Sequence, residues 1–295
     1  MIMMYKPKMN RLYNINGWAF VATAVGLIAL MTIYPIFKSL WLSFQSGRGV
    51  VTQFVGLGNI IRLFNDPMFK TALWNTLTFL VIQVPIMILL SLAISSCLNS
   101  SQLKYRQWFR IAIFLPCVTS LVAYSILFKS MFELDGVINS FLLFIHVIDD
   151  PIPWLSDPFW AKVTIIIAIT WRWTGYNMIF YLSAMQNIDK SIYEAARVDG
   201  VSPIKQFFFI TIPLLKPVIL FTSVTSTIGT LQLFDEAMNI TNGGPANATL
   251  TLSLYIYNLS FKFVPNFGYA ATVSYVIVVF SAILALIQFK AARKG

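Results

Sequence analysis

Two apolar stretches of this sequence contain polar and aromatic side chains of the kind that bind a polar solute. The first stretch places five of them within seven residues, at Trp171, Arg172, Trp173, Tyr176 and Asn177. The second carries hydroxyl and amide groups, at Ser223, Thr225, Ser226, Thr227, Thr230 and Gln232. Aromatic faces pack on the C–H patches of sugars, and hydroxyl and amide groups hydrogen-bond sugar oxygens. The two stretches together offer the chemistry of a sugar site.

The same residues could instead hold helices together. Serine and threonine hydrogen bonds join helices inside a membrane, so Ser226, Thr225 and Thr227 could be packing residues. Trp171 and Trp173 could likewise fill a helix interface. The residues alone leave both interpretations open.

Arg172 is a cation in an apolar segment, and a charge at membrane depth requires a partner. Asp235 and Glu236, at the outer end of the second stretch, are candidates for a structural ion pair. The alternative partner is a carboxylate-bearing sugar, in which case Arg172 would recognise an acidic substrate.

The composition makes lipid part of the solvent of this chain. Its 295 residues are 58% hydrophobic and only 11% charged, with a mean hydropathy of +0.74, whereas a soluble domain carries about 25% charged residues. Cys97 and Cys117 both fall in apolar segments, which indicates small buried side chains rather than a disulfide or a metal site. We expect no metal or cofactor on this chain.

Six segments are apolar enough to span a bilayer, which needs about 20 such residues. They are Trp18–Phe44, Thr71–Leu98, Phe109–Met131, Phe159–Met185, Leu214–Phe234 and Tyr269–Phe289. Basic residues precede the first segment without a small-residue cleavage site after it, so we expect a retained helix. The sequence therefore predicts an all-α membrane protein with six transmembrane helices.

The distribution of Lys and Arg predicts the orientation, since cytoplasmic segments carry the excess. One side holds thirteen: Lys6, Lys8, Arg11, Lys104, Arg106, Arg110, Lys190, Arg197, Lys205, Lys216, Lys290, Arg293 and Lys294. The other side holds seven, together with eight of the eleven acidic residues. Both termini and residues 190–213 are therefore predicted to be cytoplasmic. Since the charge is spread over four short segments, it reports orientation and does not indicate nucleic-acid binding.

The segment 190–213 is too elaborate for a simple connection between spans. Ser191 and Glu194 fit a capping box that starts a short helix, and Gly200 fits the left-handed residue that ends it. Ser202 and Pro203 fit the start of a second helix. We expect a helix–turn–helix outside the membrane, with Pro213 in the first turn of the following span.

The spacing within this segment resembles the coupling signature of bacterial ABC importer permeases. The matching residues are Glu194-Ala195-Ala196, Gly200 after three residues, Ile210 after nine, and Ile212-Pro213, where Ile212 replaces the usual leucine. The resemblance implies a coupling helix that docks in a cleft of a cytosolic ATPase. It assigns this contact to Tyr193, Glu194, Ala195, Ala196, Asp199, Gly200 and Pro213.

Further motifs resemble the carbohydrate branch of that family. Tyr34-Pro35-Ile36-Phe37 resembles the start of carbohydrate-importer permeases, and the 171–177 stretch precedes the coupling segment at the family's distance. Thr241-Asn242-Gly243-Gly244-Pro245 is similar to the larger permease subunit of maltose-type importers. The resemblance implies the ABC type I importer permease fold, with residues 1–70 as tail, first span and outer loop, 71–290 as permease core and 291–295 as cytoplasmic tail. It also implies a bacterial cell membrane and four kinds of partner: a second permease in a heterodimer, two ATPase subunits that bind ATP and magnesium, an extracytoplasmic binding protein, and a sugar.

The resemblance also implies positions for the substrate pocket. They are Trp173, Tyr176, Ser226, Gly229, Thr230, Leu233, Cys117 and Leu121, to which the residue chemistry adds Arg172 and Asn177. At Gly229, Thr230 and Leu233 the chemistry differs from the maltose-type pocket, so we expect a different sugar.

Three classes of function compete. A permease driven by partner ATPases is favoured, because the sequence has no Walker-type loop and the chain is not itself expected to be an enzyme. An ABC permease for a non-sugar solute is the alternative. An ion-coupled transporter would need carboxylates within the spans, whose inner portions have none. The lone His146 and the lack of a catalytic constellation argue against a membrane enzyme.

Overall fold

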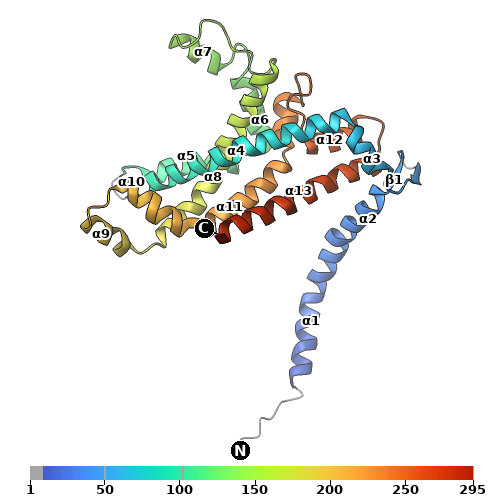
Figure 1. Ribbon diagram of the computed structural model, residues 1–295, viewed down its shortest axis with the longest axis horizontal. Helices are drawn as coiled ribbons and strands as arrows, with labels where there is room; N and C mark the ends of the chain where they lie inside the picture. Colours follow the sequence, from blue (N-terminus) through green and yellow to red (C-terminus); the bar gives the residue numbers. More distant parts are fainter. Residues whose placement is uncertain (1–8, 50, 101–102, 295) are drawn as a thin grey trace, which may run out of the picture.

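The computed structural model describes residues 9–49, 51–100 and 103–294, and this part of the chain is mostly helical (Figure 1). Its α-helices are α1 Met9–Ile28, α2 Tyr34–Ser43, α3 Gly58–Asn65, α4 Pro67–Asn99, α5 Arg106–Val118, α6 Leu121–Met131, α7 Val137–Phe144, α8 Pro158–Gln186, α9 Lys190–Val198, α10 Pro203–Gln206, α11 Ile212–Leu231, α12 Leu252–Tyr257 and α13 Phe267–Lys294. Two strands, β1 Gln45–Arg48 and β2 Val51–Phe54, form an antiparallel hairpin in which Ser46 pairs with Gln53.

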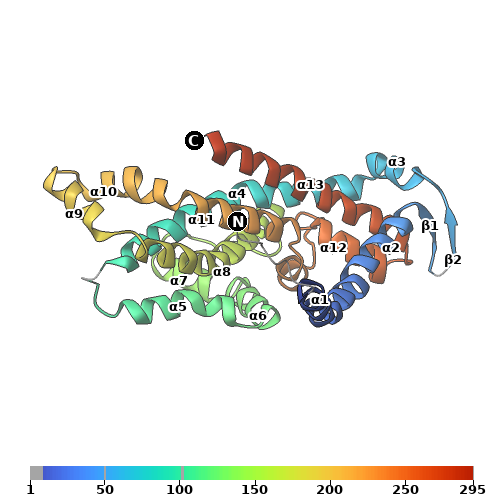
Figure 2. The same ribbon diagram turned by 90° about the horizontal axis from the view of Figure 1, so that it is seen from below.

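Four helices, α4, α8, α11 and α13, run along the long axis of the molecule (Figures 1 and 2). Helices α9 and α10 lie at one end of this bundle, and α3 with the β1–β2 hairpin lies at the other. Helix α1 leaves the bundle on one side, and α6 and α7 leave it on the opposite side in Figure 1. The bundle thus separates the segment 190–213 from the hairpin by its full length.

Within the described residues, four helices are long and apolar enough to cross a membrane. They are Gly17–Ser43, Pro67–Asn99, Pro203–Leu231 and Phe267–Arg293, which match the first, second, fifth and sixth predicted segments. The fourth predicted segment is the 29-residue helix α8, which does not belong to this set. The count of six spans therefore remains a prediction. Lys6 and Lys8, used to predict the orientation, lie outside the described residues.

The third predicted segment, Phe109–Met131, is not one helix. Its two parts, α5 and α6, meet at an angle of 103°. Thr119 and Ser120 adopt extended backbone angles at the break, and the Thr119 hydroxyl donates to the Pro116 carbonyl at 2.9 Å. Such local side-chain bonds compete with the helical ladder, so the expectation of one continuous helix was wrong, whereas a single broken span over this segment stays a prediction.

Helix α8 occupies the centre of the packing, with α4 along one face and α5 along another. The contact with α5 depends on Gly175. A Cβ at this position would stand only 2.1 Å from the carbonyl oxygen of Ile113. Because no side chain fits there, the two backbones come together as small residues allow in membrane helices. The exposed Cys97, by contrast, corrects the prediction that both cysteines are buried.

Asp66 ties together the end of the bundle opposite α9. Its carboxylate caps α4 by accepting from the N–H groups of Met68 and Phe69. The same carboxylate accepts hydrogen bonds from the hydroxyls of Tyr255 and Tyr269, each at 2.5 Å. Burial alone would raise the pKa of Asp66, but these hydrogen bonds outweigh it and hold the pKa below its ordinary value. The carboxylate thus joins α4, α12 and α13.

Replacing Asp66 with alanine should lower the melting temperature of the chain more than replacing Asp157 does. Asp157 caps α8 through Phe159 and Trp160 in the same way, without tyrosine partners. A lost cap costs about 1 kcal/mol, and the two buried tyrosine hydroxyls at Asp66 add about 1–3 kcal/mol each.

The additional loss of stability in the Asp66→Ala variant, compared with Asp157→Ala, should depend on pH. The pKa of Asp66 is lower in the folded chain than in the unfolded chain, where it is about 4. The carboxylate therefore stabilises the fold above about pH 4, and this stabilisation is lost as the pH falls through the folded-state pKa. Thermal unfolding between pH 7 and pH 3 checks this. Equal losses of melting temperature for the two alanine variants at pH 7 would contradict the stabilising role of the Tyr255 and Tyr269 hydrogen bonds to Asp66.

Candidate functional site

The aromatic residues predicted to bind solute gather where α8 meets α11. The ring of Trp173 lies against the backbone of Gly229, where a Cβ would be 3.4 Å from Cζ2 of Trp173. Trp173 meets Tyr176 edge to face, with ring centroids 5.5 Å apart. Tyr176 remains 37% exposed. The structure therefore brings Trp173, Tyr176 and Gly229 into one partly open patch.

A second group of predicted residues lies buried beside this patch. The amide nitrogen of Asn177 on α8 donates to the Trp173 carbonyl at 2.9 Å and lies 3.4 Å from the hydroxyl of Ser226 on α11. One turn along, the Thr230 hydroxyl is 2.9 Å from the side-chain oxygen of Gln83 on α4. Asn177, Ser226, Thr230 and Gln83 thus form a polar seam between three helices.

Gln83 was not singled out by the sequence analysis. It is fully buried, and its amide nitrogen has no hydrogen-bond partner among the described residues. The signal was present, because Gln83 is an amide in the middle of an apolar segment, and polar residues in such segments usually mark functional positions.

The remaining pocket positions are placed differently. The Cys117 thiol, at the end of α5, donates to the backbone carbonyl of Arg172 at 2.8 Å, and Leu121 is the first residue of α6 after the bend. Both therefore lie at the junction of α5, α6 and α8. Leu233 is buried in the main apolar core instead, where its carbonyl accepts from the Thr251 hydroxyl.

Arg172 has an internal partner. Its guanidinium nitrogen Nη1 lies 3.5 Å from Oε1 of Glu236, and the two side chains are 17% and 4% exposed. This confirms Glu236, of the two predicted candidates, as the carboxylate that faces Arg172. Asp235 is only partly buried and accepts through its backbone carbonyl from Asn239.

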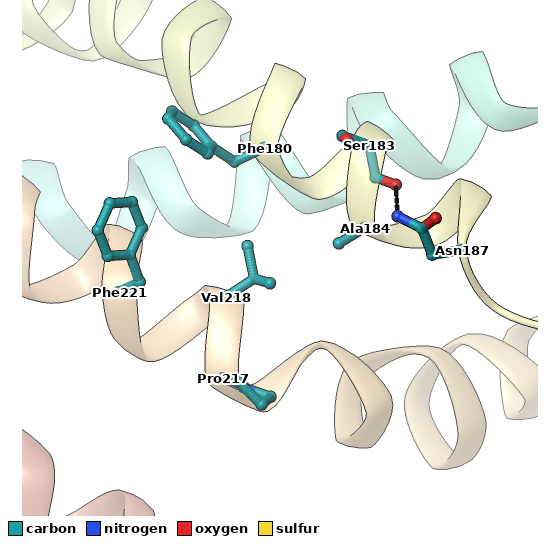
Figure 3. A pocket seen from close by; sticks show the side chains of 7 residues that line it. All are labelled: Phe180, Ser183, Ala184, Asn187, Pro217, Val218 and Phe221. Atoms are coloured by element: carbon teal, nitrogen blue, oxygen red, sulfur yellow. Dashed lines mark hydrogen bonds between the residues drawn. The ribbon is translucent and has the colours of Figure 1, made fainter. Parts of the chain in front are cut away.

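A groove of about 370 Å³ lies between α8 and α11, nearer to α9 (Figure 3). Its lining is mainly apolar: Phe180, Ser183, Ala184, Asn187, Pro217, Val218 and Phe221. The ring of Phe180 is 5.7 Å from that of Phe221 and 5.1 Å from that of Tyr176. A row of aromatic rings therefore connects the groove with the patch around Trp173.

The segment 190–213 has the predicted helix–turn–helix form, with one corrected cap. Asp189, not Ser191, caps α9: its carboxylate accepts from the N–H of Ser191 at 2.9 Å. This bond lowers the pKa of Asp189, and a carboxylate at a helix N-terminus is further favoured by the helix dipole. The capping box of Ser191 and Glu194 was therefore wrong, and Glu194 is exposed.

The turn after α9 is held by backbone hydrogen bonds. Gly200 is left-handed, with φ of +73°. The N–H of Val201 donates to Ala196 and that of Gly200 to Arg197, at 2.9 and 3.0 Å. This is the Schellman pattern that ends helices at glycine, and Ser202 caps α10 as predicted.

The rest of the segment presents a small exposed surface. Ala195, Asp199 and Pro213 are exposed, and Val198 is 88% exposed although it is apolar. Ala196 is buried, and the Tyr193 hydroxyl pairs with Thr211 at 2.9 Å, which holds α9 against the chain that follows. Pro213 lies inside a continuous helix, because a π-helical turn, Phe207–Thr211, joins α10 to α11.

Comparison with known proteins assigns this architecture. A family model described as "Binding-protein-dependent transport system inner membrane component" matches residues 72–293. The chain is 64% identical, over 98% of both chains, to the lactose transport system permease protein LacF of Rhizobium radiobacter. It is 34% identical to the arabinooligosaccharides transport system permease protein AraP of Bacillus subtilis, over 92% of this chain and 87% of that one.

A solved structure agrees with these sequence matches. It is a bacterial alginate ABC transporter in complex with an alginate pentasaccharide-bound periplasmic protein. One of its chains superimposes with a TM-score of 0.79 and 25% identity, over 95% of each chain.

Proposed function

The chain belongs to the family of binding-protein-dependent transport system inner membrane components, and we propose that it is the sugar-translocating permease of an ATP-driven importer. The observation that carries the proposal is the 64% identity to a lactose permease over nearly the whole chain. We propose lactose, or a closely related neutral disaccharide, as the substrate. The patch of Trp173, Tyr176 and Gly229 supports this, because aromatic faces and nearby hydroxyls suit a sugar.

We propose the predicted topology for this permease: six spans, with both termini and α9 in the cytoplasm. In this arrangement α8 is the fourth span, and the bent pair α5–α6 is the third. The placement of α9 and α10 at the end of the bundle opposite the β1–β2 hairpin supports this orientation (Figure 1). The buried Arg172–Glu236 pair gives α8 the neutralised charge that a span requires.

We further propose the partners of an importer of this kind. A second permease forms a heterodimer with this chain, two ATPase subunits complete the complex and one of them binds α9, and an extracytoplasmic binding protein delivers the sugar. ATP binding closes the ATPases and moves α9, after which the spans change from inward-facing to outward-facing. The exposed Val198 and Ala195 supply an apolar contact surface for α9 outside the membrane.

Within this mechanism the sugar contacts are Trp173, Tyr176, Ser226, Gly229 and Thr230, with Cys117, Leu121, Arg172, Asn177 and Leu233 around them. The row of rings from Tyr176 through Phe180 to Phe221 then leads toward the groove near α9. We propose that released sugar leaves along this row, because it continues the aromatic surface toward the cytoplasmic end.

Uptake of radiolabelled lactose tests the proposed function. Proteoliposomes that contain the complete transporter should accumulate lactose only with ATP inside and the binding protein outside. A proton or sodium gradient should not replace ATP. Accumulation driven by an ion gradient without ATP, or no lactose accumulation at all, would overturn the proposal.

A further inference from the structure

Eleven buried side-chain polar atoms have no hydrogen-bond partner among the described residues, and three of these atoms belong to neighbouring side chains around Arg172. They are the Tyr124 hydroxyl on α6, Nε of Arg172 on α8 and Oε1 of Glu236, which follows α11. Tyr124 and Glu236 are each only 3% exposed. Buried polar atoms are nearly always paired, so three such atoms in one place need an explanation.

Arg172 lies next to both of the other two side chains. The guanidinium carbon of Arg172 lies 5.9 Å from the ring centre of Tyr124 and 5.9 Å from that of Trp173. The Arg172–Glu236 distance of 3.5 Å suits an ion pair but exceeds the usual length of a hydrogen bond. Glu236 therefore keeps an open acceptor although its charge is compensated.

Aromatic rings form the wall of this group. Trp171 lies 6.1 Å from Tyr124 and 5.2 Å from Phe128, centre to centre. Arg172, between Trp171 and Trp173 in sequence, retains 17% exposure. The group is thus connected through Arg172 to the patch where Trp173 lies on Gly229.

The unpaired hydrogen-bond donors and acceptors match a pair of sugar hydroxyls. Arg172 Nε–H and the tyrosine O–H donate, whereas Glu236 Oε1 and the tyrosine oxygen accept, and each sugar hydroxyl does both. The ion pair has no net charge, and a carboxylate on the substrate would meet the Glu236 carboxylate. The arrangement therefore suits a neutral sugar better than an acidic one.

We propose that Tyr124, Arg172 and Glu236 form a binding subsite for neighbouring hydroxyl groups of a neutral sugar, next to Trp173. This proposal rests on the proposed function and makes it more specific. It assigns substrate contact to Tyr124 and Glu236, and it replaces the acidic-substrate hypothesis for Arg172.

Replacing Tyr124 with phenylalanine tests the subsite, with Tyr181→Phe as the matched control. Tyr181 is also fully buried, but its hydroxyl has a protein partner, Thr222, at 2.6 Å. Loss of the unpaired Tyr124 hydroxyl should leave the melting temperature unchanged or raise it, whereas loss of the Tyr181 hydroxyl should lower it. A purely structural role for Tyr124 would predict no further effect of the substitution.

The subsite adds an effect on transport. Y124F should slow lactose uptake by the complete transporter roughly three- to tenfold at saturating binding protein, which is the worth of one hydrogen bond. Y181F should keep the wild-type rate per folded complex. The deoxy-lactose that lacks the hydroxyl facing Tyr124 should be taken up equally slowly by wild type and Y124F.

The outcomes separate the two proposals. Wild-type transporter without ATP-driven lactose uptake would remove the proposed function and this subsite with it. Normal wild-type uptake, with Y124F within about twofold of it for lactose and for every deoxy analogue, would overturn the subsite alone.

Discussion

Replacing Gly175 with alanine should strongly destabilise the permease. The new Cβ would stand 2.1 Å from the backbone oxygen of Ile113. Backbone cannot rotate away as a flexible side chain can, so α5 must move off α8. Ordinary overpacking costs about 1–3 kcal/mol, and a backbone obstacle should reach or exceed the upper end.

The expected result is a melting temperature lower by about 10 °C or more in detergent, and a smaller folded fraction in gel filtration. Gly26→Ala is the matched control. Gly26 lies in α1, and no described residue comes within 4 Å of its added methyl, so alanine there should be neutral or should stabilise the helix by up to about 1 kcal/mol. Equal melting temperatures for the two variants would contradict the close α5–α8 contact.

Replacing Gly200 with valine should strongly reduce ATP-driven sugar uptake. Gly200 has φ of +73° and open space around it, so the cost is torsional, about 1–2 kcal/mol for an L-residue and more for a β-branched one. The valine would displace the turn that aims α9. We expect the transporter to assemble while uptake falls at least tenfold. Asparagine, which tolerates this conformation, should retain most of the uptake.

Gly49→Val controls for strain in general. Gly49 has φ of +63° and open space too, but it lies at the hairpin end, opposite α9 (Figure 1), so its valine variant should keep normal uptake. Glu194→Ala should weaken uptake only partly, because Glu194 takes no part in capping α9. Wild-type uptake by the Gly200→Val protein would refute the role of α9 in coupling.

The long helices could be predicted because apolar length is a strong signal that needs no tertiary information. The expectation of one continuous helix over the third segment failed for a local reason. Hydropathy over Phe109–Met131 is continuous, and the hydrogen bond from Thr119 to Pro116 that accompanies the break has no hydropathic signature. The prediction of the residue that caps α9 failed for a similar reason. Asp189 and Ser191 are both good caps two residues apart, and only the folded geometry decides between them.

The candidate site was predictable where polar residues cluster along the chain. Trp173, Tyr176 and Ser226 stood out in this way, and so did the charge pair of Arg172 with Glu236. Gln83 and Tyr124 did not, because each is isolated in its own segment and gains meaning only from helices distant in sequence. Sequence spacing reports contacts within a helix, whereas these contacts lie between helices.

The helix from Pro203 to Leu231 has a mechanical consequence. It is one 29-residue element, so the second half of the segment 190–213 and the helix that carries Ser226 would act as a single lever. At 1.5 Å per residue, Ser226 lies about 35 Å from the tip of this helix at Pro203. A tilt of about 10° around that tip would carry Ser226 about 6 Å sideways, twice the length of a hydrogen bond. Such a lever would bend at the π-helical turn Phe207–Thr211. The stiffness of this turn would therefore set how much of the tilt is transmitted to Ser226.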